Sequence, residues 1–332
     1  MGAPRPGAPI ASGTPVVSGT PIASGTPVVS GTPVASGTPV VSGTPVASGT
    51  PVASVGLVAD RIAWEERLLI EAAPAFGLRI DWVNDESLSL GHPDAPAIKG
   101  YDTLLVRSRS YTRGGLIATL AEAAGVPTLN TARAIHACEN KAALRALLQT
   151  AGVPVPDHRL VLSRKDFAKA LADLPLPLVL KPVFGGMGKR VTLIRHADTA
   201  HSVYDYVEDL AHAFEQASLV EPYLGGSSVR CLVVGRELVG AAEFESGGSD
   251  WRNNAALGNK NRAIAHDPDV VKIVDGVVDV LGPGIYGIDL FATPDGYVVN
   301  EVNHAPGFRA VASATGADIP SAIGRYVQEL LA

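Results

Sequence analysis

A proline recurs at every sixth residue near the amino terminus, and this spacing limits what the first part of the chain can form. From Ser12 to Ala53, seven units of Ser-Gly-Thr-Pro are each followed by Val-Val, Val-Ala or Ile-Ala. A β-helix has such a period, but proline would remove a ladder donor at each equivalent position, and seven units complete only about two coils. Arg5 is the one charged residue before position 55. Residues 1–54 are therefore predicted to be a disordered, extended tail without a catalytic role.

The rest of the chain has an ordinary globular composition, which excludes several classes of protein. The net charge of −6 argues against a nucleic-acid-binding protein. The most apolar stretch, residues 270–285, contains three charged residues, so no membrane span is expected. The two cysteines, Cys138 and Cys231, cannot form a disulfide framework, which favours the cytoplasm. Together with His136 and His304 they lack metal-ligand spacing, and all four are interpreted as structural.

Apolar spacing beyond the tail predicts three regions of mixed α/β character. Strands alternate with helices over residues 55–130, which indicates a small parallel α/β domain. The second region, residues 131–217, opens with a long helix over 131–150, and the third, residues 218–332, is rich in strands and ends with a helix over 319–331. The predicted strands are 54–58, 78–83, 103–106, 178–181, 191–194, 218–220, 229–234, 238–244, 285–291 and 297–302, and the other predicted helices are 68–76, 116–124 and 199–217.

A candidate phosphate-binding loop follows one of these strands, in Lys181-Pro-Val-Phe-Gly-Gly-Met-Gly-Lys189. Glycines let backbone N–H groups approach an anion, and a strand-end lysine adds a positive charge. The pattern differs from the P-loop, in which Gly-Lys-Ser/Thr opens a helix. A simple hairpin loop is the alternative interpretation.

A candidate metal site combines Asp289 with Glu301-Val-Asn303. Residues two apart on a strand point to the same side, so Glu301 and Asn303 share a face, and Asp289 lies on the preceding strand of the same predicted hairpin. Two carboxylates and an amide oxygen suit Mg²⁺. The alternative is a hairpin with solvated polar residues, but the apolar neighbours of these residues predict a core hairpin, in which carboxylates need partners.

Two weaker patterns concern a nucleobase and substrate carboxylates. Leu219-Val-Glu-Pro-Tyr-Leu224 is a strand leading into two glycines, and a hinge of this kind can present backbone groups to a nucleobase. Arg107, Arg109 and Arg230 could bind carboxylate or phosphate through paired N–H groups. Taken singly, each arginine is more often a surface salt-bridge residue.

The order of these elements resembles the ATP-grasp ligases: Lys141, then Lys181 with its glycine loop, then Glu-Pro-Tyr-Leu, then Asp289 and Glu-x-Asn. The stretches 289–304 and 314–320 are most similar to the RimK group, and within it to the ligases of lysine and arginine biosynthesis that act on an amino-group carrier protein (LysX-like). Arg107-Ser-Arg-Ser110, Asn130-Thr131, Val153-Pro-Val-Pro156 and Trp251-Arg-Asn-Asn254 fit the same family. The resemblance spans residues 55–332.

This resemblance implies an ATP-grasp fold, α/β and in part α+β, with a small domain at 55–130, a central and lid subdomain at 131–217 and a C-terminal subdomain at 218–332. It implies an ATP-dependent ligase that joins a carboxylate to an amine through an acyl phosphate, with ATP and Mg²⁺ (or Mn²⁺) as cofactors. The implied partners are an amino acid and a small acidic carrier protein or peptide, and the implied assembly is a homo-oligomer, a dimer or a tetramer.

The resemblance also implies roles for individual residues. Nucleotide-binding roles fall on Lys141, Lys181, Gly185, Gly186, Gly188, Glu221, Tyr223 and Leu224. Metal binding falls on Asp289, Glu301 and Asn303, and catalytic roles fall on Arg230 and Asn254. Binding of substrate carboxylates falls on Arg109 and Arg309.

Three positions depart from the family pattern: Asn140 and Ser228 stand where aspartates are usual, and Leu257 stands in place of an arginine. These departures leave a second hypothesis open, a catalytically impaired protein that binds nucleotide as a regulator or scaffold. A third, with the tail as the peptide substrate, is weak because residues 12–53 contain no side-chain carboxylate.

Overall fold

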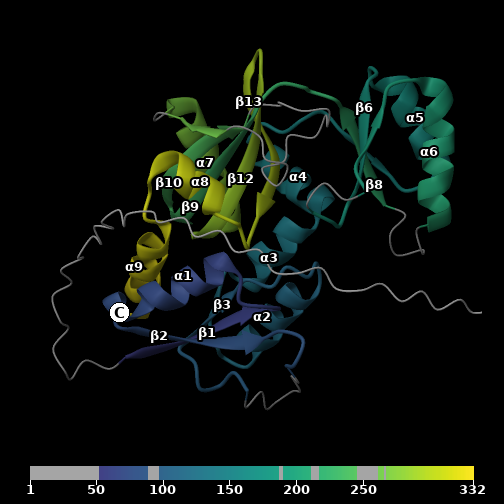
Figure 1. Ribbon diagram of the computed structural model, residues 1–332. Coiled ribbons are helices and arrows are strands. Elements are labelled where there is room, and N and C mark those ends of the chain that lie inside the picture. Colours follow the sequence, from purple (N-terminus) through teal and green to yellow (C-terminus); the bar gives the residue numbers. More distant parts are fainter. Residues whose placement is uncertain (1–51, 89–96, 187–189, 211–216, 245–260, 265–266) are drawn as a thin grey trace, which may run out of the picture. The chain divides into compact units, whose positions relative to one another are not determined.

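The computed structural model describes residues 52–88, 97–186, 190–210, 217–244, 261–264 and 267–332 (Figure 1). Residues 1–51 of the predicted tail, together with Gly188, Asn254 and Leu257, lie outside the described residues. The prediction of a disordered tail over residues 1–54 is wrong at its end, because Ala53 and Ser54 begin a strand in which they pair with Leu78 and Arg79. Among the described helices, none is both long and apolar enough to cross a membrane.

The first part is a four-stranded parallel sheet in the order β2-β1-β3-β4, as the alternating pattern predicts. The two central strands are buried because helices cover both faces: α1 and α9 pack on one, α2 and α3 on the other. The elements are β1 (Ala53–Ala59), α1 (Trp64–Ala72), β2 (Leu78–Asn84), β3 (Thr103–Val106), α2 (Arg113–Ala123), β4 (Thr128–Leu129), α3 (Ala132–Glu139) and α9 (Ile319–Leu331).

The long helix predicted over residues 131–150 is wrong at Asn140, where the chain forms two helices, α3 and α4 (Lys141–Thr150). Asn140 has an extended backbone and forms an isolated bridge with Phe184. Its side-chain oxygen accepts a hydrogen bond from the backbone N–H of Ala143 at 2.9 Å. Asparagine caps a helix as well as aspartate does, so this departure from the family pattern preserves the local structure.

The second part is a four-stranded antiparallel sheet in the order β5-β8-β6-β7, on which α5 and α6 pack. β5 and α5 were not predicted, although Ser163 caps α5 by accepting a hydrogen bond from the backbone N–H of Asp166. The elements are β5 (Arg159–Val161), α5 (Arg164–Asp173), β6 (Leu178–Pro182), β7 (Thr192–Ile194), α6 (Ala197–Leu210) and β8 (Ser218–Pro222).

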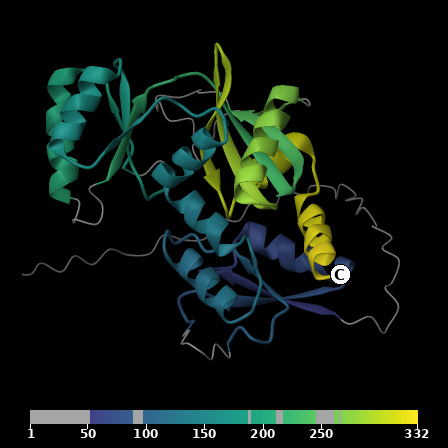
Figure 2. The same ribbon diagram turned by 180° about the vertical axis from the view of Figure 1, so that it is seen from behind.

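The third part is a five-stranded antiparallel sheet in the order β11-β10-β9-β12-β13. Its apolar run 270–281 forms α7, which turns Ile273, Val277 and Leu281 toward one face of the sheet; this helix is light green in Figure 2. Residues of α8 and α9 pack on the other face. The elements are β9 (Ser228–Gly235), β10 (Glu237–Phe244), β11 (Asn261–Ala263), α7 (Pro268–Leu281), β12 (Gly284–Thr293), β13 (Gly296–Asn303) and α8 (Arg309–Thr315).

Asn130, directly after β4, ties the parallel sheet to the five-stranded sheet. Its side-chain amide donates to the carbonyls of Ile285 at 2.8 Å and His304 at 2.9 Å, and its oxygen accepts from the N–H of Ile285 at 2.6 Å. A Cβ on Gly284 would lie 2.3 Å from that oxygen, so the close approach requires glycine. One side chain therefore fixes the start of β12 and the residue after β13 relative to β4.

Candidate active site

A cavity of about 430 Å³ opens between the three sheets. Its walls come from the loop after β3, the first residue of α4, the glycine loop after β6, the end of β8, and strands β9, β12 and β13. The structure brings twelve of the predicted site residues to this cavity: Arg109, Lys141, Lys181, Gly185, Gly186, Glu221, Tyr223, Leu224, Arg230, Asp289, Glu301 and Asn303. Gly188 and Asn254 lie outside the described residues.

The metal-binding candidates meet on the β12–β13 hairpin because of its register. Asp289 pairs directly with Glu301, and the amide of Asn303 lies 3.5 Å from a carboxylate oxygen of each. Arg230, on β9, donates from Nε and Nη2 to the two oxygens of Asp289, both at 2.6 Å. A carboxylate has about four lone-pair sites, so Asp289 keeps acceptor capacity beside Arg230. Asn303 turns its Nδ2 toward these carboxylates, and with its amide oxygen turned there instead the three side chains would form an oxygen donor set that fits Mg²⁺.

Burial and nearby charges shift the pKa values of Asp289 and Glu301 in opposite directions. Burial raises the pKa of Asp289 above its ordinary value, and Arg230 opposes this rise. Burial acts on Glu301 in the same direction, but the positive charges of Lys141, Arg230 and Lys181 outweigh it and bring the pKa of Glu301 below its ordinary value. Glu301 is therefore a carboxylate at neutral pH.

The two predicted phosphate-binding lysines are buried, and both contact protein acceptors. Lys141 Nζ donates to the carbonyl of Gly185 and lies 4.0 Å from Glu301. Lys181 Nζ contacts Glu221 and donates to the side-chain oxygen of Asn300 at 3.1 Å. Burial lowers the pKa of both lysines. Both lysines line the same cavity as the β12–β13 hairpin.

Sequence reasoning missed Asn300 and Arg145. Alternation places Asn300 on the face opposite Glu301, but a β-bulge between the pairs Asp289–Glu301 and Leu290–Val299 leaves Asn300 as the extra residue, and its side chain reaches Lys181. No periodicity reveals such a bulge. Arg145 carried a signal, because it lies four residues after Lys141 on α4 and therefore on the same helix face.

The glycine loop starts with two anchored residues. The N–H of Gly186 donates to the hydroxyl of Tyr111 at 2.7 Å, so the loop is held to the segment after β3. Gly185 has a φ of 144°, which favours glycine. With Lys141 bound to the carbonyl of Gly185, the start of the loop contacts two elements that line the cavity.

The predicted nucleobase hinge uses its polar groups within the protein. The N–H of Tyr223 donates to the carbonyl of Pro177 at 2.9 Å. The carboxylate of Glu221 is buried against Lys181 and Arg145. Leu224 stays on the cavity wall as a partly exposed apolar surface.

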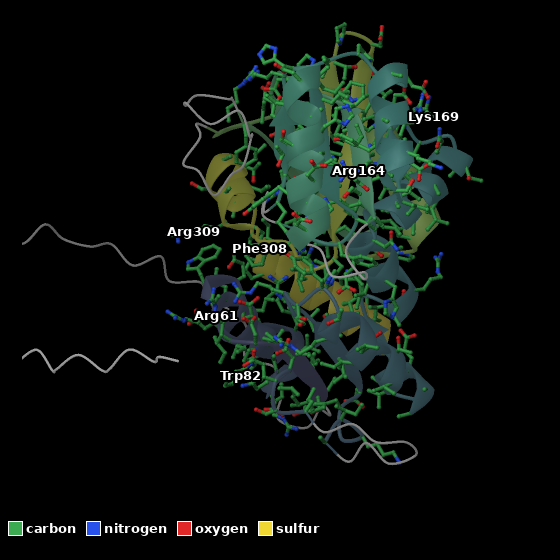
Figure 3. All side chains as sticks on the ribbon, turned by 90° about the vertical axis from the view of Figure 1, so that its right-hand side faces the viewer. Arg61, Trp82, Arg164, Lys169, Phe308 and Arg309 are labelled. Atoms are coloured by element: carbon green, nitrogen blue, oxygen red, sulfur yellow. The ribbon has the colours of Figure 1, made fainter. Side chains whose placement is uncertain are left out.

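The two predicted substrate arginines differ in position. Arg109 lines the cavity and forms a two-point ion pair with Asp60, at 3.1 and 2.7 Å, which lowers the pKa of Asp60. The structure does not bring Arg309 to the cavity wall; its guanidinium lies 5.4 Å from the ring centre of Trp64, beside Phe308 (Figure 3). A contact between Arg309 and substrate stays a prediction.

Two residues interpreted as structural also reach the cavity, His304 and Cys138. His304 Nε2 lies 3.6 Å from Glu139. Burial raises the pKa of Cys138 far above its ordinary value, so the thiol stays protonated and is a poor nucleophile.

Comparison with known proteins identifies the family. Residues 138–327 match the RimK-like ATP-grasp domain, and residues 55–137 match the LysX preATP-grasp domain. The chain belongs to the RimK-like ATP-grasp family. It is an ATP-dependent carboxylate–amine ligase with a mixed α/β ATP-grasp fold. Segments 7–39 and 23–59 match a repeat of unknown function described from Schizosaccharomyces pombe.

Two curated relatives of this ATP-grasp ligase match over nearly their whole length. The glutamate–LysW ligase ArgX of Sulfurisphaera tokodaii is 30% identical over 278 residues, 83% of this chain and 98% of that protein. The α-aminoadipate–LysW ligase LysX of the same organism is 26% identical over 281 residues, again 83% and 98%. The crystal structure of an ATP-grasp RimK domain protein from Sphaerobacter thermophilus has a TM-score of 0.71 at 28% identity, covering 82% of this chain and 99% of that one.

Proposed function

We propose that this ATP-grasp ligase joins an amino acid such as glutamate to the carboxylate of a glutamate on a small acidic carrier protein or peptide. The observation that supports the proposal is the cavity, whose lining includes two buried lysines, the proposed metal ligands of the β12–β13 hairpin, and Arg109. The similarity to a glutamate–LysW ligase supports the choice of substrates.

In this proposal, the carrier carboxylate attacks the γ-phosphorus of ATP, the bond between that phosphorus and the β–γ bridging oxygen breaks, and ADP leaves. The amino-acid nitrogen then attacks the acyl carbon, the bond from that carbon to the phosphate oxygen breaks, and the nitrogen loses a proton to solvent. Holding donor and acceptor together supplies much of the rate, because charge on the phosphoryl group must be neutralised and the reacting atoms aligned.

Each cavity residue has a proposed part in these steps. Lys141 and Lys181 exchange Gly185 and Asn300 for α- and β-phosphate oxygens. Asp289, Glu301 and Asn303 would hold Mg²⁺ or Mn²⁺, which would supply positive charge beside the phosphates. Arg230 donates to Asp289 from Nε and Nη2, and its remaining N–H groups are proposed to stabilise an oxyanion, with Asn254 proposed beside it.

The glycine loop of Gly185, Gly186 and Gly188 is proposed to cover the phosphates and to exclude water, which would hydrolyse an acyl phosphate. Glu221, through its backbone, and Tyr223 and Leu224 are proposed to frame the nucleobase. Arg109 is proposed to bind the carboxylate of the incoming amino acid by releasing Asp60. We further propose a cytoplasmic location, supported by two free, buried cysteines, and a dimer or tetramer.

The test incubates the purified chain with ATP, Mg²⁺, a peptide ending in glutamate, and each member of an amino-acid panel that includes glutamate and 2-aminoadipate. We expect ADP release that requires both peptide and amino acid, together with a peptide mass increased by one amino-acid residue. Nucleotide binding without ADP release for every pair would favour the regulatory hypothesis, which rests on Ser228 lining the cavity in place of an aspartate.

A further inference from the structure

Arg145 is almost fully buried, 2% exposed, and yet it is not among the residues that line the cavity. Its Nη2 donates to Glu221 Oε2 and to the backbone carbonyl of Asn300, both at 3.0 Å. Lys181 binds the same two residues through their other acceptors, Glu221 Oε1 and Asn300 Oδ1. The four residues form a closed ring, called here the Arg145 ring: Arg145, Glu221, Lys181 and Asn300.

The charge of the Arg145 ring is the first reason to connect it with function. Arg145 and Lys181 are cations and Glu221 is an anion, so the ring carries one net positive charge. Without Arg145, Glu221 would neutralise Lys181, and that part of the cavity would lose its attraction for phosphate. The positive charge of Arg145 offsets the negative charge of Glu221, so the positive charge of Lys181 remains available to a ligand.

The geometry of the Arg145 ring is the second reason. The carbonyl that Arg145 holds belongs to the bulged residue Asn300, next to Glu301 of the metal hairpin. A bulge is a local break in a ladder, so its backbone needs an external partner to keep one conformation. Arg145 provides that partner for the residue directly before Glu301.

A purely stabilising role fits the arginine poorly. Its Nη1 is buried and has no hydrogen-bond partner in the described part of the chain. An unpaired buried donor is costly, and a buried ion pair is often no more stabilising than apolar residues of the same volume. The helix itself does not require arginine at position 145, because α4 also contains the small apolar residues Ala143 and Ala146.

We infer that Arg145 is a positioning residue for nucleotide binding, which acts through Lys181 and the Asn300 bulge without touching the ligand. The inference rests on the proposed roles of Lys181 and Glu301. It concerns a residue to which neither the sequence motifs nor the family comparison assigns a role.

The experiment measures binding of AMP-PNP by calorimetry at fixed Mg²⁺, with the melting temperature of each variant. Arg145→Met should weaken binding tenfold or more. The double variant Arg145→Met/Glu221→Gln restores one net positive charge and should recover at least half of that loss on a logarithmic scale. Arg145→Lys keeps the positive charge and should bind AMP-PNP within about threefold of wild type. It is the variant to measure if Arg145→Met fails to fold. Arg159→Met, in an ion pair with Asp157 outside the cavity, is the control.

Several results would overturn the inference: Arg145→Met binding within twofold of wild type, a double variant no better than Arg145→Met, or Arg145→Lys weakened tenfold or more. Absence of AMP-PNP binding by the wild-type chain would overturn the inference and the nucleotide roles together. Nucleotide binding by the wild-type chain without ligation would overturn the substrate proposal alone and leave the inference standing.

Discussion

Two groups of ion-paired residues beside the cavity differ in how deeply they are buried. One lies at the proposed nucleotide site, called here the nucleotide end, and the other at the proposed substrate site, called the substrate end. At the nucleotide end, Lys181, Glu221 and Arg145 have side chains no more than 7% exposed. At the substrate end, the side chains of Arg109 and Asp60 are 44% and 25% exposed. Breaking a buried pair leaves an uncompensated charge and costs about 3–5 kcal/mol, whereas an exposed pair contributes about 0–1 kcal/mol. We therefore expect the buried ion pairs of the proposed nucleotide end to persist when a ligand binds, and Arg109 of the proposed substrate end to exchange Asp60 for a ligand.

The largest effect should follow from Glu301→Gln at the nucleotide end. Removing one carboxylate from the Asp289–Glu301 pair weakens Mg²⁺ binding at the phosphates, so we expect turnover to fall by about two orders of magnitude or more. The melting temperature without nucleotide should fall modestly, because the nearby cations of Lys141 and Lys181 stabilise the Glu301 carboxylate.

Asp295→Asn is the matched control for Glu301→Gln, since it removes one carboxylate from the exposed turn of the same hairpin. It should leave turnover and melting temperature unchanged. Normal turnover of Glu301→Gln at a lowered melting temperature would show a salt-bridge role and remove the metal assignment.

A smaller effect is expected from Tyr111→Phe. Tyr111 lies two residues after Arg109 and binds the glycine loop through Gly186. The change removes the hydroxyl that accepts from the N–H of Gly186, a bond worth about 1 kcal/mol, or roughly fivefold in binding. We expect the KM for ATP to rise by about that factor with kcat less affected. Tyr206→Phe, on the exposed face of α6, is the control. An unchanged KM for ATP in Tyr111→Phe would mean that the loop needs no anchor on the small domain.

At the substrate end, Asp60→Asn should change stability by less than about 1 kcal/mol at pH 7. The hydrogen bond from Arg109 lowers the pKa of Asp60 in the folded state. Its stabilising contribution is therefore present above the unfolded pKa, about 3.9, and is lost as the pH falls through the folded value. Urea unfolding of wild type and variant at pH 7 and at pH 3 measures this difference. A loss of 3 kcal/mol at pH 7 would contradict the contrast between the two ends.

The smallest effect is expected from removing the tail. A chain that begins at Ala53 should ligate at the wild-type rate, because the repeat supplies no charged group from Ser12 onward. A tenfold loss at equal folded concentration would show that the tail contributes to turnover. Equal rates would allow all other variants to be measured in the shorter chain.

The parts of the molecule that could be predicted are those that depend on the local spacing of apolar and polar residues. The bounds of α9 and β3 agree with the apolar spacing of residues 319–331 and 103–106. The proximity of Asp289, Glu301 and Asn303 was predictable because alternation places Glu301 and Asn303 on one face and a short turn joins their strand to that of Asp289.

The parts that could not be predicted depend on contacts between distant residues. Asn140 interrupts a continuous helical pattern because it bridges to Phe184. Asn300 faces the cavity because of a bulge that shifts the register. Arg309 follows β13 closely in sequence, but its guanidinium lies over the ring of Trp64, a residue of α1. None of these contacts leaves a trace in the spacing of apolar residues.

The hydrogen bonds of Asn130 have a consequence for how the enzyme opens. Separating the small parallel domain from the five-stranded sheet would strip partners from the N–H and carbonyl of Ile285 and from the carbonyl of His304 at once. These two parts should therefore move as one rigid body during a catalytic cycle. We expect the opening that exchanges nucleotide to be a movement of the remaining sheet, β5-β8-β6-β7 with α5 and α6, relative to these two parts.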